Sequence, residues 1–212
     1  MSKTEHTVQQ YWDERSDLFG DYYLKPSLFD KIFRKAVYTR EAVAVKTCKE
    51  LETPTVLDIG SGPGVNSISI LKNSSAKHVF GIDFAPNMIE YAEELAKKEG
   101  HQDSTTFVEG DFMNYDFDTK IFDVSIALGV LDYIGPAQSF LTKMVGVTNK
   151  ACVISWPENG LRMGLRRYRY TCPLYHYNLD QILNLHKVAG IDSSMVEVVR
   201  VPGGWVTIGF KQ

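Results

Sequence analysis

Apolar residues recur along the chain in two alternating rhythms. Short aliphatic and aromatic runs, which are typical of buried strands, fall at about residues 55–60, 78–83, 105–110, 121–127 and 150–156. Segments with apolar positions at helical spacing lie near them, at about 64–73, 86–99 and 137–146. Strands that alternate with helices form right-handed βαβ units, so we predict an α/β fold built on a doubly wound, mostly parallel sheet.

The two ends of the chain depart from this alternation. Residues 5–50 have helical spacing in two pieces. Towards the other end, Asn178 and Gln181 stand at capping-box spacing and predict a helix over residues 178–189. The apolar runs on either side of Gly203-Gly204 then predict an antiparallel hairpin.

The composition is that of a single globular domain. With 212 residues, 44% of them hydrophobic and 23% charged, the chain can bury a sizeable core. Its net charge of −3 lacks the basic excess that binding to bulk nucleic acid or to an anionic membrane needs. There is no signal-peptide core and no long apolar run, so we expect a cytoplasmic protein.

Cysteines and histidines suggest no metal site. The three cysteines, Cys48, Cys152 and Cys172, are widely separated, and we expect them to be reduced. Four histidines are scattered without ligand spacing, and we expect them at the surface: His6, His78, His101 and His186.

The stretch TVLDIGSGPGVN, residues 55–66, ends a predicted strand in alternating glycines. Glycine lets the chain turn sharply and lets a ligand approach the backbone. The dinucleotide fingerprint is G-x-G-x-x-G, but here Val65 stands in place of its third glycine and Pro63 removes an amide from the turn. This spacing makes a poor phosphate cradle and disfavours a nicotinamide oxidoreductase.

Acidic residues end the next two predicted strands. Asp83 follows the second strand, where a carboxylate can accept from both hydroxyls of a ribose. Asp111 and Phe112 follow the third strand, where they could bond an adenine amino group and pack its ring. Asp83 by itself fits NAD as well as any other adenosine-bearing ligand.

In this order, VLDIGSGPG, GIDFAPNMIEYA and GDF resemble the motifs of the class I S-adenosylmethionine-dependent methyltransferases. The resemblance implies a Rossmann-like, seven-stranded sheet whose final strand inserts antiparallel. It implies S-adenosylmethionine as cofactor and S-adenosylhomocysteine as product. It also implies one domain over residues 1–212, with a helical lid (1–50), a cofactor-binding core (55–156) and a substrate-covering segment (157–177).

The resemblance assigns cofactor contacts to particular residues. It implies that the methionine part is contacted by Tyr11, Asp58, Gly60, Ser61 and Gly62, and that the ribose is bound by Asp83. It implies that the adenine is surrounded by Phe84, Met88, Asp111 and Phe112, and that Leu128 and Gly129 lie near the methyl group. Structural roles remain open for several of these residues: Asp58 could cap the strand end, Met88 and Phe112 could be core, and Tyr11 could pack with Trp12 between helix and sheet.

The substrate-covering segment contains a basic pattern. Arg162, Arg166 and Arg169 recur at helical spacing, and Leu161, Leu165 and Tyr168 do the same one residue earlier. An amphipathic helix satisfies both patterns, with its apolar face on the protein. The basic face could point to solvent, or into the pocket to bind a carboxylate or phosphate. Tyr175 follows as a further substrate-binding candidate.

Three residues are candidates for general-base or related catalytic work. His176 precedes a predicted helix N-terminus, which favours the neutral imidazole. Asp132 and Tyr133 follow the fourth strand, although Asp132 could instead cap the next helix. A base is needed only if the acceptor must lose a proton.

Together these features predict a methyltransferase that moves a methyl group to an oxygen or nitrogen of a small, anionic metabolite by in-line displacement. The partner expected is therefore a small molecule, and the patterns do not indicate an oligomeric state. One alternative is a non-catalytic S-adenosylmethionine-binding sensor or partner subunit. Another is an RNA or protein methyltransferase, which the absence of an N-P-P-Y motif and of a basic domain disfavours.

Overall fold

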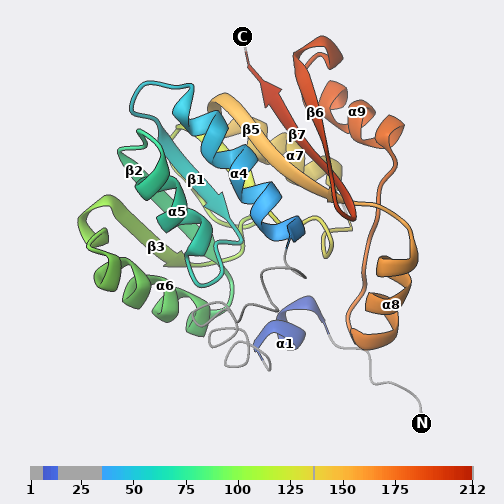
Figure 1. Cartoon of the computed structure of the whole chain (residues 1–212), viewed down its shortest axis with the longest axis horizontal. Coiled ribbons are helices and arrows are strands. Elements are labelled where there is room, and N and C mark those ends of the chain that lie inside the picture. The colour runs from blue at the N-terminus through green and yellow to red at the C-terminus, as the bar shows by residue number, and fades with distance from the viewer. Residues whose placement is uncertain (1–6, 14–34, 136, 212) are drawn as a thin grey trace.

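The computed structural model describes residues 7–13, 35–135 and 137–211, arranged around one seven-stranded sheet (Figure 1). The strands are β1 (Thr55–Ile59), β2 (His78–Asp83), β3 (Thr105–Glu109), β4 (Phe122–Ala127), β5 (Thr148–Pro157), β6 (Val196–Val201) and β7 (Gly204–Phe210). Their order in the sheet is β3-β2-β1-β4-β5-β7-β6. The first five strands are parallel, whereas β7 runs antiparallel to both β5 and β6. The predicted fold class, terminal hairpin included, is confirmed.

Helices cover both faces of the sheet. They are α1 (Val8–Asp13), α4 (Lys35–Lys49), α5 (Val65–Asn73), α6 (Pro86–Glu99), α7 (Ala137–Gly146), α8 (Leu161–Arg169) and α9 (Leu179–Val188). In Figure 1, α4, α5 and α6 lie over one face, while α7 and α9 pack together over the other. α1 and α8 lie away from these layers, beyond one end of the sheet (Figure 1).

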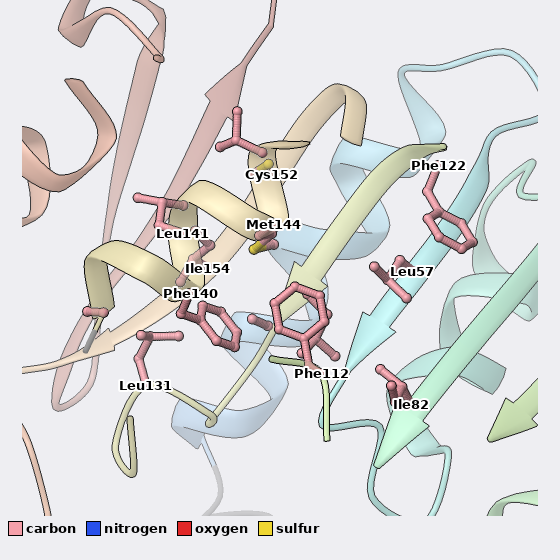
Figure 2. Packing of buried hydrophobic residues seen from close by; sticks show 14 of the residues in the cluster. Leu57, Ile82, Phe112, Phe122, Leu131, Phe140, Leu141, Met144, Cys152 and Ile154 are labelled. Atoms are coloured by element: carbon pink, nitrogen blue, oxygen red, sulfur yellow. The ribbon is translucent and has the colours of Figure 1, made fainter. Parts of the chain in front are cut away.

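The core follows from the period of two along the strands. Adjacent residues Val56 and Leu57 are both 0% exposed, yet they belong to clusters on opposite faces of the sheet. Such burial on both faces is typical of parallel strands. Figure 2 shows the cluster on the α7 side, which includes Phe140 and Leu141 of α7 together with Leu57 and Ile82 of the sheet.

The predicted capping box of α9 is confirmed. Asn178 accepts a hydrogen bond from the amide of Gln181, and the side chain of Gln181 accepts one from the amide of Asn178. The helix ends at Val188, and Gly190 follows with a φ of 96°, a left-handed conformation that glycine adopts readily.

The expectation that His186 lies at the surface is wrong. Its side chain is fully buried, and its Nδ1 donates to the carbonyl of Ile182 at 2.9 Å. Nε2 therefore accepts from the hydroxyl of Thr207, which in turn accepts from the indole N–H of Trp156 at 2.8 Å. Burial lowers the pKa of His186, partly opposed by the bond to Ile182, so this network holds a neutral imidazole. His6 lies outside the described residues.

Helical structure is present within residues 5–50, as α1 and α4. Residues 14–34 of the expected helical lid lie outside the described part of the chain. Within the described residues, no helix is long and apolar enough to cross a bilayer.

Candidate active site

The strand order reverses between β1 and β4, which are neighbours in the sheet. In open α/β sheets, ligands bind at such a point, outside the carboxyl ends of the strands. The glycine turn after β1 meets the loop after β4 there, because a Cβ on Gly60 would come within 2.6 Å of Val130 Cγ2. Gly60 also has a φ of +67°. Both the close approach and the backbone conformation therefore require glycine at this position.

The amides of the glycine turn are largely used within the protein. Those of Gly60 and Ser61 both donate to the carbonyl of Ile82, at 2.8 and 3.1 Å. Any contact that these two residues make with a ligand would therefore come from a carbonyl or a side chain. Gly62 faces open space, since nothing lies within 4 Å of the position of its Cβ.

The backbone holds the carboxylate of Asp83 in place at the end of β2. Its Oδ2 accepts from the amide of Gly62 at 2.8 Å, and its Oδ1 accepts from the amide of Ala85 at 3.0 Å. These two bonds orient Asp83 across the glycine turn at the end of β2.

Asp58 and Ser61 contribute buried oxygen atoms without a hydrogen-bond partner among the described residues. Asp58 Oδ2 accepts from the hydroxyl of Ser67 at 2.6 Å, but Asp58 Oδ1 and Ser61 Oγ are unsatisfied. Burial raises the pKa of Asp58 to about 7, a shift that the Ser67 bond opposes and the charge of Asp83 reinforces. Buried polar atoms normally have partners, so these two atoms fit a ligand that brings a hydrogen-bond donor to the turn.

The residues expected around an adenine lie along the neighbouring strand ends. Phe84 is half-buried after β2, and Met88 is buried in the first turns of α6. Asp111 is exposed after β3, where its carboxylate accepts from the amide of Met113 and the side-chain amide of Asn114. Asp111 is thus part of a turn of its own, with its side chain at the surface.

Phe112 lies in the core. It is 6% exposed, and its ring centroid lies 5.0 Å from that of Phe140 and 5.9 Å from that of Phe117 (Figure 2). This packing favours the structural role that the sequence left open. A contact between Phe112 and an adenine ring stays a prediction.

The end of β4 is shaped by Gly129. Its φ is +85°, and its amide donates to the hydroxyl of Ser155 on β5 at 2.8 Å. Leu128 beside it is half-buried. Arg40 of α4 also reaches this point, because its Nη1 lies 4.0 Å from the position that a Cβ on Gly129 would occupy.

Asp132 and Tyr133, in the loop after β4, both bind Arg166 of α8. Nη1 of Arg166 donates to Asp132 Oδ1 at 2.5 Å, and Nη2 donates to the hydroxyl of Tyr133 at 3.1 Å. Burial lowers the pKa of Arg166, but the charge and hydrogen bond of Asp132, together with Tyr133 and Tyr170, outweigh this effect, and the net direction is upward. Burial raises the pKa of Tyr133 above its usual range. The geometry favours Asp132 as an anchor for Arg166, since its oxygen is taken up by the guanidinium.

Four aromatic rings, called here the aromatic cluster, join α1 to this ion pair: Tyr11, Trp12, Tyr133 and Tyr170. The ring of Tyr11 stacks on that of Tyr170 with centroids 5.1 Å apart, and Trp12 meets Tyr133 edge-on at 5.4 Å. The guanidinium of Arg166 lies 5.1 Å from the centroid of Tyr170. Tyr11 is only 2% exposed, so the packing role that the sequence left open is present in the structure.

His176 and Tyr175 lie at the surface of the substrate-covering segment. A nitrogen of Arg167 lies 2.9 Å from His176 Nδ1. A guanidinium can only donate, so Nδ1 accepts and the proton of the neutral imidazole is on Nε2. Tyr175 packs against Gly135, and its amide donates to the carbonyl of Asp132. His176 is thus exposed and held by Arg167.

Comparison with known proteins shows what the chain resembles. Residues 56–151 match the methyltransferase domain family. Over 84 residues, the chain is 32% identical to a 2-phytyl-1,4-naphtoquinone methyltransferase of Nostoc punctiforme, a match covering 39% of this chain and 36% of the relative. Over 165 residues it is 25% identical to a norajmaline N-methyltransferase of Rauvolfia serpentina, covering 69% and 56%. The matched part therefore spans about a third of the first relative and little more than half of the second.

A crystal structure has the same fold over nearly the whole chain. It is the magnesium protoporphyrin IX methyltransferase of Synechocystis with bound S-adenosylhomocysteine, with a TM-score of 0.75, 16% identity, and coverage of 97% of this chain and 98% of that one. Residues 56–151 match a methyltransferase domain, and the chain has the fold of that crystal structure over nearly its whole length.

The protein has a cavity of about 270 Å³ beyond the end of β5. It is lined by Arg40, Pro157, Glu158, Gly160, Met163, Arg166, Pro202 and Gly203. Among the predicted substrate-side residues whose side chains the structure describes, Arg166 lies in this lining. The side chains of Arg162 and Arg169 lie outside the described part of the structure, so their roles stay predictions.

Helix α8 forms where expected. Tyr168, expected on the packed apolar face, is 80% exposed, so that expectation is wrong for this residue. Among the described side chains of α8, Met163 is buried and Arg166 is half-buried. Arg166 points inward, where it pairs with Asp132.

Sequence reasoning missed Arg40, Glu158 and Met163 of the cavity. Arg40 lies in a helix far from every motif, and Glu158 and Met163 carry no recognisable pattern. One signal could have indicated that Arg40 faces the protein. Ala36 and Ala44 stand four residues before and four residues after it, and small apolar residues at that spacing mark the packed face of a helix.

Proposed function

We propose that this protein transfers a methyl group from S-adenosylmethionine to an oxygen or nitrogen of a small, anionic metabolite. The observation that carries the proposal is the pair of buried, unsatisfied oxygens, Asp58 Oδ1 and Ser61 Oγ, next to the oriented carboxylate of Asp83. This arrangement supplies acceptors for an ammonium group and for a ribose diol at one strand-end site. Two such acceptor sets match the two ends of an adenosyl amino acid.

In this proposal each part of the cofactor has a binding element. Asp83 binds the ribose hydroxyls, while Asp58 and Ser61 accept from the amino group of the methionine part. Phe84 and Met88 flank the adenine, and Asp111 lies at its edge. Tyr11 brings α1 over the methionine part, since it is fixed to α8 through Tyr170.

The chemistry places few demands on the protein. When bound, S-adenosylmethionine supplies a methyl group already activated by the positive charge of its sulfur. The protein must then align the acceptor with that methyl group, which is a proximity effect. We assign this work to Leu128 and Gly129, which form the floor at the end of β4.

The geometry also bears on proton transfer. Asp132 is held by Arg166, and His176 is held by Arg167 at the surface. The lining of the cavity includes no histidine, cysteine or tyrosine among the described residues. An acceptor that is already deprotonated, or that loses its proton to water, needs no general base. This favours such an acceptor over one that a strong base must activate.

The relatives support a small-molecule acceptor. Their names state a naphtoquinone, the alkaloid norajmaline and magnesium protoporphyrin IX. These three differ widely in shape and charge, so they support the class of acceptor and leave its identity open to experiment. The net charge of −3 agrees with a small molecule over bulk nucleic acid.

The direct test is calorimetric titration with S-adenosylhomocysteine, for which we expect micromolar binding. Asp83→Ala should weaken binding by about 1–3 kcal/mol, because polar groups of the ligand lose a buried partner. Asp103→Ala, which removes an exposed acid outside the site, is the control. Absence of binding to the wild-type protein would refute the proposal. Binding without methyl transfer to any member of a broad acceptor panel would instead support a sensor or partner subunit.

A further inference from the structure

We propose that Ser67 is a positioning residue for the cofactor: its hydroxyl holds the carboxylate of Asp58 so that Oδ1 accepts from the amino group of the methionine part. The inference rests on the proposed function and adds a residue of α5 that lies just beyond the glycine-rich stretch of residues 55–66. Ser67 acts through Asp58 and does not itself touch the ligand.

The sheet fixes the backbone of Asp58. This residue stands in β1, which lies between β2 and β4, and its partners in register are Gly81 and Ile126. A residue paired on both sides cannot move its Cα without breaking ladder hydrogen bonds, which are costly to lose in a buried strand. Only rotation of the side chain can therefore redirect the carboxylate. The group that holds this side chain decides where its second oxygen points.

The hydroxyl of Ser67 is that group. Ser67 is 0% exposed, and its Oγ donates to Asp58 Oδ2 at 2.6 Å, a distance typical of a strong bond from a hydroxyl to a carboxylate. Ser67 lies in the first turn of α5, which begins at Val65 directly after the glycine turn. The bond therefore fixes the carboxylate against the start of the helix.

The second oxygen is the one that requires a ligand. Asp58 is 0% exposed, and its Oδ1 has no hydrogen-bond partner among the described residues; the same is true of Ser61 Oγ, in a residue that is 3% exposed. Burial of a carboxylate is costly unless a donor or a positive charge replaces the lost water. An ammonium group brings three donors and a positive charge. If Ser67 only satisfied a structural carboxylate, the unpaired Oδ1 would have no explanation.

The ionisation of Asp58 depends on the same bond. Burial raises the pKa of Asp58 most strongly, the bond from Ser67 lowers it, and the negative charge of Asp83 raises it. On α4, which packs against α5, the carboxylate of Glu41 accepts from the hydroxyl of Ser69. Loss of the Ser67 hydroxyl should therefore raise the pKa of Asp58 further and extend its protonated form to higher pH.

The test compares two ligands by calorimetric titration of the full chain at pH 7.5. S-adenosylhomocysteine carries the amino group, whereas S-adenosyl-4-thiobutanoate has a hydrogen atom in its place and is otherwise identical. We expect the wild-type protein to bind S-adenosylhomocysteine at least about tenfold more tightly, because the analogue leaves the buried carboxylate without its donor.

Variants then assign this preference to Ser67. Ser67→Ala should reduce the preference by about five- to tenfold and leave the affinity for the analogue nearly unchanged. Ser69→Ala is the matched control, since it removes another hydroxyl of α5 that donates to a carboxylate, and it should keep the full preference. Ser67→Cys keeps nearly the same shape with a weaker donor, so its preference should be intermediate. If Ser67→Ala does not fold, Ser67→Cys decides, because undiminished preference there contradicts the inference.

The pH dependence supplies a readout that a merely structural role would not change. In the wild-type protein the affinity for S-adenosylhomocysteine should fall as the pH drops below about 7, because Asp58 becomes protonated. In Ser67→Ala the fall should begin at a higher pH. The affinity for the analogue should follow neither profile. A fall at the same pH in both proteins contradicts the inference.

Three further outcomes overturn it: equal affinity of the wild-type protein for the two ligands, full preference in Ser67→Ala, and equal weakening of both ligands by that change. The last of these would mean that Ser67 acts on stability alone. Failure of the proposed function gives a different result. A preference that Ser67→Ala leaves intact removes only the role of Ser67, whereas absence of S-adenosylhomocysteine binding to the wild-type protein removes both.

Discussion

Asp58 is a carboxylic acid in a place where its charge is costly. Its side chain is completely buried, and only one of its two oxygens has a partner among the described residues. The pKa of about 7 means that near neutral pH the ligand-free protein holds Asp58 partly protonated. A ligand that brings a positive group to Oδ1 would stabilise the ionised form and lower this pKa.

From this we predict a proton-linked affinity for S-adenosylhomocysteine. Binding should release a proton below pH 7, so the affinity should rise with pH up to about 7 and then level off. Between pH 8 and pH 6 the dissociation constant should increase by about tenfold. Calorimetry at pH 6 in two buffers of different ionisation enthalpy measures the number of protons released on binding. Asp58→Asn should give a flat profile, and a wild-type profile equally flat would contradict the assignment.

At the scale of elements, the ion pair of Asp132 and Arg166 ties the loop after β4 to α8. The carboxylate is almost fully buried, so it cannot be left alone without a large cost. The wall of the cavity therefore depends on one electrostatic contact between two segments that are far apart in the sequence.

We predict that Asp132→Ala lowers the free energy of unfolding by about 3 kcal/mol, because Arg166 is left partly buried without its partner. The double change Asp132→Leu with Arg166→Met should recover most of this loss. Lys46→Ala, which breaks an exposed ion pair with Glu50, should cost less than about 0.5 kcal/mol. Chemical denaturation measures all three. If Asp132→Ala costs no more than Lys46→Ala, the anchoring role is wrong.

The docking of α1 rests on aromatic contacts. Tyr11→Ala removes the stack on Tyr170 and should weaken docking by about 0.5–1.5 kcal/mol beyond the lost burial. Hydrogen exchange of the α1 amides, residues 8–13, should speed up accordingly, whereas Tyr11→Phe should leave it nearly unchanged. Tyr38→Ala, at an exposed position of α4, controls for the loss of a tyrosine. Equal exchange in all three variants would rule out docking through Tyr11.

Elements with a strong local pattern were predictable from the sequence. The strands and helices between residues 55 and 146 agree with the structure to within about two residues, because glycines and a proline mark their ends. The capping box of Asn178 and Gln181 was equally local. The exposure of Tyr168 and the inward position of Arg166 were not predictable from helical spacing, because Arg166 pairs with Asp132, which is far away in the sequence.

Properties of the whole molecule were the hardest to predict. The sequence around His186 gives no sign that this polar residue is buried. Its partner Thr207, which also binds Trp156, comes close to it only when the sheet is assembled. Arg40 likewise gains its place only when α4 packs across the sheet beside Gly129. By contrast, the positions of Gly60 and Phe84 at strand ends could be predicted in advance, because each directly follows the apolar run of a predicted strand.

The burial of His186 leads to a prediction about global stability. Its pKa is lowered by burial, so below about pH 6.5 the unfolded chain binds more protons than the folded protein. The contribution of His186 to the free energy of unfolding should therefore fall as the pH drops through this range. Asp58 acts in the opposite sense, because its pKa is raised from the ordinary aspartate value of 3.8 to about 7, and between these two values the folded protein binds more protons.

A comparison of variants isolates the contribution of His186. His186→Gln should lower stability at pH 8, because it disrupts the bonds to Ile182 and Thr207, yet as the pH drops from about 7.5 to 5.5 its free energy of unfolding should fall less, or rise more, than that of the wild type. Denaturant titrations across this range measure the difference. His101→Gln should keep the wild-type slope. A slope unchanged in His186→Gln would assign the acid sensitivity to other groups.

Because the strand order reverses between β1 and β4, the residues of the candidate site fall into two groups, one on each half of the sheet. The acids proposed to hold the nucleoside stand on the β1–β3 side, whereas Arg40, the end of β5 and the β6–β7 turn shape the opposite wall. Changes in that wall leave the first half untouched. A lineage could thus exchange one methyl acceptor for another while inheriting its donor site intact, and a protein engineer could do the same.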